Sequence, residues 1–211
     1  QGDHRRRFSC QGERGRWLSR FDPDWGWVAP AVGEDQRLQL WETGSAEQRQ
    51  AALMQWRALD PGAAREALVQ AWASEAPEAR VRLLSCLAVG LGPDDEAFLQ
   101  LALDDPRKEV RVAAQGMLVK LPGSALRRRL QAAAEPLLQL KRPLLGQARL
   151  EIVLPESLDK ALTRDGVGAA AHPGLGEKAG WLVDLLTATD PRVWSERFET
   201  NPRELALIAS R

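Results

Sequence analysis

The sequence has little of what catalysis and metal binding usually require. Among its 211 residues there are two histidines, two cysteines and no tyrosine. His4 and His172 are too few and too unsuitably placed for a catalytic triad or a metal centre. Cys10 and Cys86 lack CxxC spacing and nearby histidines, so neither a zinc site nor a disulfide framework is indicated. We therefore predict no enzyme activity, no metal and no cofactor.

An excess of charge and a long apolar run are also absent. The chain has 29 basic and 29 acidic residues, so its formal net charge is zero and no overall field attracts a polyanion. No apolar stretch approaches the length that spans a bilayer, and the start lacks an apolar signal-peptide core. We predict a cytoplasmic protein that has no membrane partner.

A repeat of 31 residues is the strongest positive signal. The pattern Glu-x-Arg occurs at Glu47/Arg49, Glu78/Arg80 and Glu109/Arg111. Apolar and small residues follow the same interval, in the columns Trp56, Leu87, Leu118; Leu59, Gly90, Leu121; Leu68, Leu99, Leu130; and Ala71, Ala102, Ala133. Within a unit the apolar residues fall at helical spacing, as in Val110, Ala113, Ala114, Met117, Leu118 and Leu121. Each unit is therefore predicted to bury one helical stripe.

Helix start and stop signals divide each unit into two helices. Ser45 and Gln48 form a capping-box pattern, and Asp60-Pro61 supplies an N-cap followed by a proline in the first turn. Gly92-Pro93 and Pro122-Gly123 occupy the matching turns of the later units. The predicted helices are 45–59, 61–74, 77–91, 93–104, 106–121 and 124–140. One pair alone cannot bury its apolar stripe, so the pattern predicts an all-α solenoid of antiparallel helix pairs, an α-α superhelix.

A family resemblance accompanies this pattern. Residues 104–114, with an Asp-Pro turn followed by Val-Arg and small residues, resemble a HEAT-type repeat, and that resemblance covers roughly residues 45–140. Residues 12–18, 23–25, 121–126 and 175–182 together resemble an uncharacterised family of bacterial HEAT-like proteins. Its members are often encoded beside MoxR-type ATPases, von Willebrand A-domain proteins and SWIM zinc-finger proteins. The resemblance implies a multi-protein assembly with an AAA+ ATPase or a von Willebrand A-domain protein as partner, and it brings no catalytic residues.

The chain is predicted to have three parts. Residues 1–44 form a helical cap rich in tryptophan and arginine, residues 45–141 form three HEAT-like repeats, and residues 142–211 form a helical extension with a glycine-rich loop. Both ends look cut, because the chain opens with Gln1 and its last amphipathic pattern is still running at Ile208. We expect a fragment of a longer chain.

The C-terminal part contains several local signals. Residues 150–155 alternate in the manner of a short strand, whose partner lies outside the fragment unless the segment simply runs extended across the array. Ser157 is predicted to cap a short helix through Leu162. A loop from Asp165 to Gly176 then leads into a helix that carries Trp181 and docks on the end of the solenoid.

Two sets of residues are candidates for binding. Arg49, Arg80 and Arg111 are predicted to line up along the stack, where they pack against the adjacent repeat or bind a ligand; we favour packing. Arg14, Arg16 and Trp17 lie in a segment where arginines alternate with aromatic rings, a mixture that binds nucleic acid through phosphate pairing and base stacking. The alternative, which we favour, is that the tryptophans close the end of the solenoid and the arginines stay solvated.

Two further patterns carry less weight. The side chains of Arg127, Arg128 and Arg129 point about 100° apart on a helix, so they form no flat patch. A solvated outer face, or contact with an acidic protein partner, is the better interpretation. Residues 174–179 formally fit GxGxxA, but His172-Pro173 precedes them in place of a strand, so a dinucleotide site is not indicated.

These observations predict a non-catalytic HEAT-like scaffold for protein–protein interaction in a bacterial MoxR ATPase-associated assembly. The alternative is a HEAT-like nucleic-acid-binding protein or a DNA glycosylase-like enzyme. Alkylpurine DNA glycosylases resemble this chain in having tryptophans and aspartates on helical repeats, although their signature is not matched residue by residue.

Overall fold

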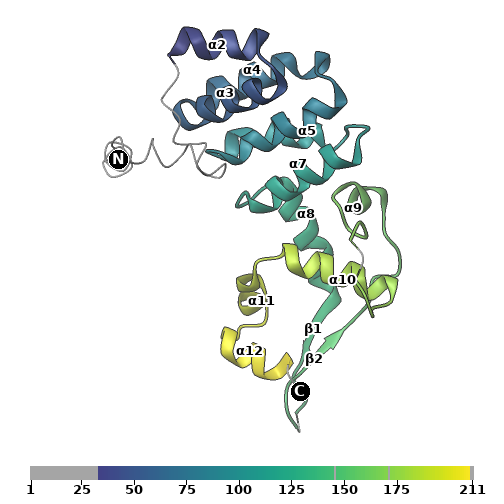
Figure 1. Ribbon diagram of the computed structural model, residues 1–211. Helices are drawn as coiled ribbons and strands as arrows, with labels where there is room; N and C mark the ends of the chain where they lie inside the picture. The colour runs from purple at the N-terminus through teal and green to yellow at the C-terminus, as the bar shows by residue number, and fades with distance from the viewer. Residues whose placement is uncertain (1–32, 145, 171, 210–211) are drawn as a thin grey trace, which may run out of the picture. The chain divides into compact units, whose positions relative to one another are not determined.

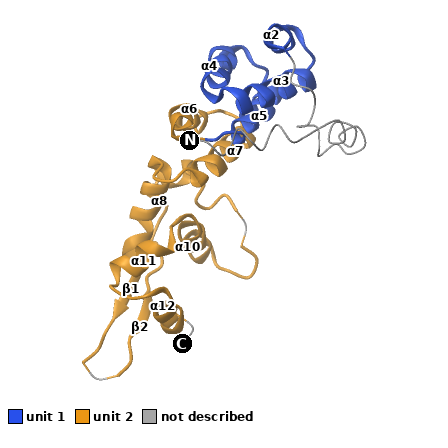
Figure 2. Cartoon of the chain, turned by 90° about the vertical axis from the view of Figure 1, so that its left-hand side faces the viewer, with its two compact units in different colours: residues 1–91 blue, residues 92–211 orange. Residues whose placement is uncertain are grey.

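A computed structural model describes residues 33–144, 146–170 and 172–209. The chain divides into two compact units, residues 1–91 and 92–211 (Figure 2). Their boundary falls at the Gly92-Pro93 turn, between the two helices of the second predicted repeat. The described residues are mostly helical, and the one sheet among them has two strands. This agrees with a helical chain that contains a short extended segment.

Side-chain caps fix the starts of two helices of the first unit, which Figure 1 labels α3 and α4. Ser45 Oγ accepts the backbone N–H of Gln48 at 3.3 Å, and Gln48 Oε1 accepts that of Ser45 at 2.8 Å, which confirms the predicted capping box. Asp60 accepts the N–H of Ala63 at 2.9 Å ahead of Pro61. The elements are α2 (Glu34–Thr43), α3 (Ala46–Leu59), α4 (Pro61–Ala71), the 3-10 turn η2 (Trp72–Ser74), α5 (Pro77–Ser85) and η3 (Cys86–Ala88).

The core of the first unit surrounds α3, which packs against α2, α4 and α5. Its fully buried leucines are Leu53, Leu68, Leu83, Leu84 and Leu87. Gly90, which shares a repeat column with Leu59 and Leu121, has a φ of +63°, and a Cβ there would lie 3.1 Å from Pro61 Cγ. Residue 90 is therefore a glycine, where the other two repeats have leucine, because the chain turns tightly against Pro61 at this position.

The second unit contains the remaining elements. None of the described helices in either unit is long and apolar enough to cross a membrane. The elements are η4 (Pro93–Asp95), α6 (Glu96–Ala102), α7 (Lys108–Lys120), α8 (Ala125–Ala134), η5 (Glu135–Leu137), β1 (Leu138–Lys141), β2 (Arg149–Ile152), α9 (Lys160–Arg164), α10 (Glu177–Ala188), α11 (Pro191–Arg197) and α12 (Pro202–Ala209).

Helix α7 is the centre of this unit. It packs against α6 and α8, and α10 packs against α8. Its predicted stripe is buried at Val110, Ala114, Met117 and Leu118. The helix that carries Trp181 therefore packs directly on α8.

The end of the third repeat differs from the prediction. A helix was expected to reach residue 140, but α8 ends at Ala134, and a 3-10 turn containing Pro136 leads into β1. Pro136 has no backbone N–H to donate to the carbonyl four residues earlier, so the α-helical hydrogen bonding stops there. The expected lone strand has its partner within the chain, since β1 pairs antiparallel with β2 and Leu138 faces Ile152.

The residue predicted to cap α9 was also wrong. Ser157 was expected to cap this helix, but Asp159 does so, because its carboxylate accepts the N–H of Leu162 at 2.7 Å. Residues 165–176 contain neither helix nor strand where they are described, which confirms the predicted loop. We call residues 165–170 the glycine loop; it contains Gly166 and Gly168, both with positive φ.

Candidate functional site

The predicted arginine Arg49 is held by contacts within the first unit. Its Nε donates to the carbonyl oxygen of Trp41 at 2.8 Å, and its guanidinium pairs with both carboxylate oxygens of Glu75. The guanidinium lies 4.6 Å from the centre of the Trp41 ring. The hydrogen bond to Glu75 raises the pKa of Arg49. These contacts give Arg49 a packing role, and it also lines a small cavity of about 160 Å³.

Arg80 and Arg111 bind the turns that precede their own helices. Arg80 lies 5.4 Å from the centre of the Trp72 ring and donates to the carbonyl of Ala73 at 3.4 Å. Arg111 donates to the carbonyls of Asp105 and Pro106 at 2.8 and 2.9 Å. Each of the three repeat arginines thus fastens the start of a helix to the end of the preceding one. This favours the packing interpretation over a ligand-binding ladder.

The tryptophans under two of these arginines show a signal that sequence reasoning missed. Trp41 and Trp72 are separated by 31 residues, the same interval that separates Arg49 and Arg80. A tryptophan eight residues before the arginine is therefore part of the repeat, and its indole ring supplies a cation–π contact. The third repeat has Leu103 at this place. The other candidates, Arg14, Arg16 and Trp17, lie outside the described residues.

A largely apolar groove of about 450 Å³ lies wholly within the second unit. Its walls come from α7, α8, α10 and the glycine loop, and we call it the α7 groove. Apolar side chains dominate its lining: Val112 and Val119 of α7, Leu130 of α8, Val167 and Ala169 of the glycine loop, and Ala188 of α10. Concave apolar surfaces with a few polar groups are the usual form of binding sites.

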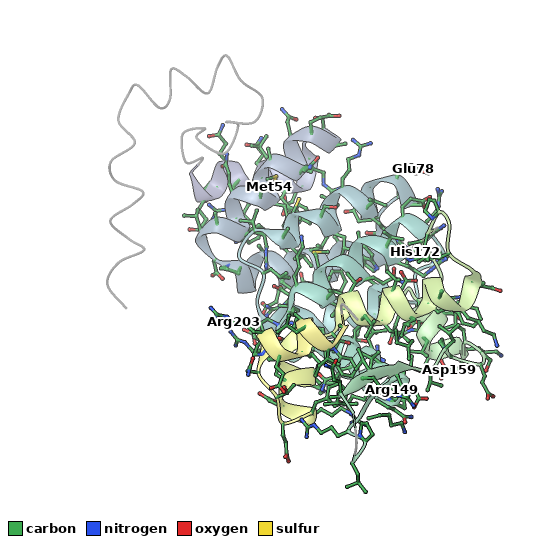
Figure 3. The ribbon with its side chains drawn as sticks, turned by 90° about the horizontal axis from the view of Figure 1, so that it is seen from below. Met54, Glu78, Arg149, Asp159, His172 and Arg203 are labelled. Carbon is green, nitrogen blue, oxygen red and sulfur yellow. The ribbon has the colours of Figure 1, made fainter. Side chains whose placement is uncertain are left out.

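Asp184 of α10 fixes the glycine loop in place beside the α7 groove. Its Oδ2 accepts the backbone N–H of Gly168 at 2.8 Å, and its Oδ1 lies 2.7 Å from Nε2 of His172. The imidazole lies beside α10 (Figure 3), where a Cβ on Gly180 would come within 3.1 Å of its Cδ2. His172 and Asp184 are thus paired with each other and shape the loop. Gly180 permits the close approach of the ring.

Asp165 anchors the beginning of the glycine loop. Its carboxylate, 1% exposed, accepts from Nε and Nη2 of Arg129 at 2.6 and 2.7 Å. This hydrogen-bonded pair raises the pKa of Arg129. Gln115 of α7 donates to the carbonyl of Arg164 at 2.7 Å next to it. The interpretation of Arg129 as part of a solvated outer face is therefore wrong, because a buried carboxylate 36 residues further along the chain turns it inward.

A second arginine–aspartate pair lies at the surface. Arg164 donates from Nε and Nη2 to the carboxylate of Asp104 at 2.5 and 2.7 Å, and the Asp104 side chain is 64% exposed. The hydrogen bond from Arg164 lowers the pKa of Asp104. The folded chain therefore releases this proton more readily than the unfolded chain does, so the pair stabilises the fold above the ordinary carboxyl pKa and not in stronger acid.

The lowered pKa of Asp104 gives a prediction for the variant Asp104→Asn. At neutral pH the variant is expected to lose about 0.5 kcal/mol of unfolding free energy, because exposed ion pairs are worth little. The difference from wild type should shrink as the pH falls below the ordinary value of about 4 and through the lowered pKa. Urea unfolding over a pH series, taken as low as the chain stays folded, measures it. A difference that stays constant down to that limit would contradict the assignment.

No group of three or more His, Cys, Asp and Glu side chains that could hold a metal ion is found in the described part of the chain. Cys86 is buried, and burial raises the pKa of its thiol to about 12, which keeps it protonated and unreactive at neutral pH. The other cysteine, Cys10, lies outside the described residues.

Comparison with known proteins gives one match. No curated protein and no solved structure matches the chain. A family of unknown function, DUF5691, matches residues 8–211, which is nearly the whole sequence. The chain therefore belongs to this family.

Proposed function

We propose that this chain is a non-catalytic scaffold for protein–protein interaction, a HEAT-like solenoid in a bacterial assembly with a MoxR-type AAA+ ATPase and a von Willebrand A-domain protein. It acts in the cytoplasm. The observation that carries the proposal is the α7 groove, an open apolar surface on a helical unit, with paired charges at its margin. An interaction surface of this kind needs an apolar centre and satisfied polar groups around it.

The repeat register supports the same conclusion. Helical repeats bury their apolar stripes against one another and leave extended surfaces for partners. In this chain the three repeat arginines form hydrogen bonds around the turns between helices, so this repeated charge has a structural role. The groove walls remain available for a partner.

Direct binding measurements test the proposal. The purified full chain is immobilised and titrated separately with the MoxR-type ATPase and the von Willebrand A-domain protein of its host. We expect saturable binding of at least one of them at micromolar concentration or tighter, since apolar surface is buried. Single- and double-stranded DNA and RNA are titrated in parallel at low salt. Nucleic-acid binding without binding of either protein would contradict the scaffold and favour the glycosylase-like alternative.

A further inference from the structure

Helix α7 carries two apolar stripes. The first is the buried stripe described above. The second consists of Val112, Gly116 and Val119, at intervals of four and three residues, and it lines the α7 groove. Val112 is 48% exposed. The solvent side of a surface helix is normally polar, so a second apolar stripe indicates a face that is covered when the protein is at work.

Gly116 is the unusual member of this stripe. It lies in the interior of α7, and apart from its chain neighbours and the nearby backbone of α7 itself, no described atom comes within 4 Å of the place where its Cβ would be. A glycine in a helix interior costs about 1 kcal/mol relative to alanine. Its φ is not in the left-handed region, so backbone conformation does not require glycine here. The remaining reason for a glycine at position 116 is that it lets another chain approach the α7 backbone closely.

The charges of the groove indicate what such a chain carries. The groove carboxylates of Asp165 and Asp184 are engaged by Arg129 and by His172. Lys108, at the amino end of the stripe, is exposed and makes no ion pair with the described residues. The unmatched charge at the margin is therefore positive. An occupant is complementary if it places a carboxylate at that end.

We propose, resting on the scaffold function above, that the α7 groove receives an amphipathic helix of a partner protein. The apolar face of that helix packs over Val112, Gly116 and Val119, and an acidic side chain at one end pairs with Lys108. The stripe from Lys108 to Val119 is about 16 Å long, which corresponds to about three turns of helix. Helix-in-groove binding of this kind is recognised by anchors at positions i, i+3 or i+4, and i+7.

Selection from a displayed peptide library tests this inference. The library contains helical peptides of about 16 residues with varied apolar and charged positions, and the bait is the wild-type full chain. We expect enriched peptides to share an apolar stripe at helical spacing and an Asp or Glu near one end. Enrichment of sequences without that spacing, or of no sequence at all, would overturn the proposal.

Matched variants locate the binding site. Gly116→Leu fills the open space and should weaken the selected peptides about tenfold or more, which corresponds to about 1.4 kcal/mol. Gly33→Leu adds the same side chain where a Cβ also meets nothing, and should leave binding unchanged. Thermal melting checks folding, and Gly116→Leu is expected to melt no lower than wild type because it improves helix propensity. Equal binding by wild type and Gly116→Leu would overturn the proposal.

Charge reversal tests the role of Lys108. Lys108→Glu should weaken the acidic peptides, and a peptide whose acidic end is changed to lysine should recover affinity for that variant. Lys120→Glu, at the other end of α7 and outside the groove lining, is the control. Failure of this inference is distinguishable from failure of the scaffold function: if the ATPase or the von Willebrand A-domain protein binds Gly116→Leu as well as wild type, the scaffold stands and the groove assignment falls.

Discussion

Replacing Arg57 by methionine is expected to lower the unfolding free energy by about 3–5 kcal/mol, because buried polar groups left without partners carry the full cost of desolvation. Arg57 is completely buried in the first unit. Its guanidinium donates to the carbonyl oxygens of Pro61, Leu87, Val89 and Gly90 at 2.7–3.1 Å. One side chain thus joins α3 to the start of α4 and to the turn after η3. Methionine keeps the apolar stem but none of these bonds.

Urea unfolding at neutral pH measures this effect. The matched control is Arg82→Met, because Arg82 is an exposed arginine in a 3.7 Å ion pair with Glu47. That pair should be worth less than about 1 kcal/mol. A loss for Arg57→Met as small as the loss for Arg82→Met would contradict the role assigned to the buried guanidinium.

Asp165→Ala should have the second largest effect, a loss of about 2–3 kcal/mol in unfolding free energy, because it removes a buried charged acceptor. The carboxylate fastens the glycine loop to α8 through Arg129. Without it, the loop side of the α7 groove should exchange its amide hydrogens faster. Asp104→Ala is the control, since it breaks an arginine pair of similar geometry at the surface.

Urea unfolding and hydrogen exchange of both variants separate the two pairs. We expect Asp104→Ala to lose less than about 1 kcal/mol and to leave exchange in the glycine loop unchanged. If the two variants lost equal stability, burial would not be what gives the Asp165 pair its strength.

Local signals in the sequence predicted most of the helices. Capping at Ser45 and Asp60 and the buried stripe of α7 depend on residues within four positions of each other, so their pattern is readable along the chain. The strand β1 was not predicted, because its leucines alternate with polar residues over only four positions after Pro136. Its pairing with β2 depends on a segment eleven residues further on.

The groove, the buried Arg57 and the half-buried Arg129 depend on contacts that are distant in the sequence. Arg57 stands in the last turn of α3, where a basic residue is usually explained by the helix dipole. Its acceptors lie up to 33 residues away. Arg129 likewise finds its carboxylate 36 residues on. Apolar periodicity could show the second stripe of α7, but it could not show that the glycine loop and α10 form the opposite wall.

Hydrogen exchange of the full chain, alone and bound to its protein partner, tests the central claim that the function is partner binding at the α7 groove. We expect slower exchange on binding to be concentrated in residues 108–120 and in the glycine loop, residues 165–170. Protection that falls elsewhere, with both of these segments unchanged, would contradict it.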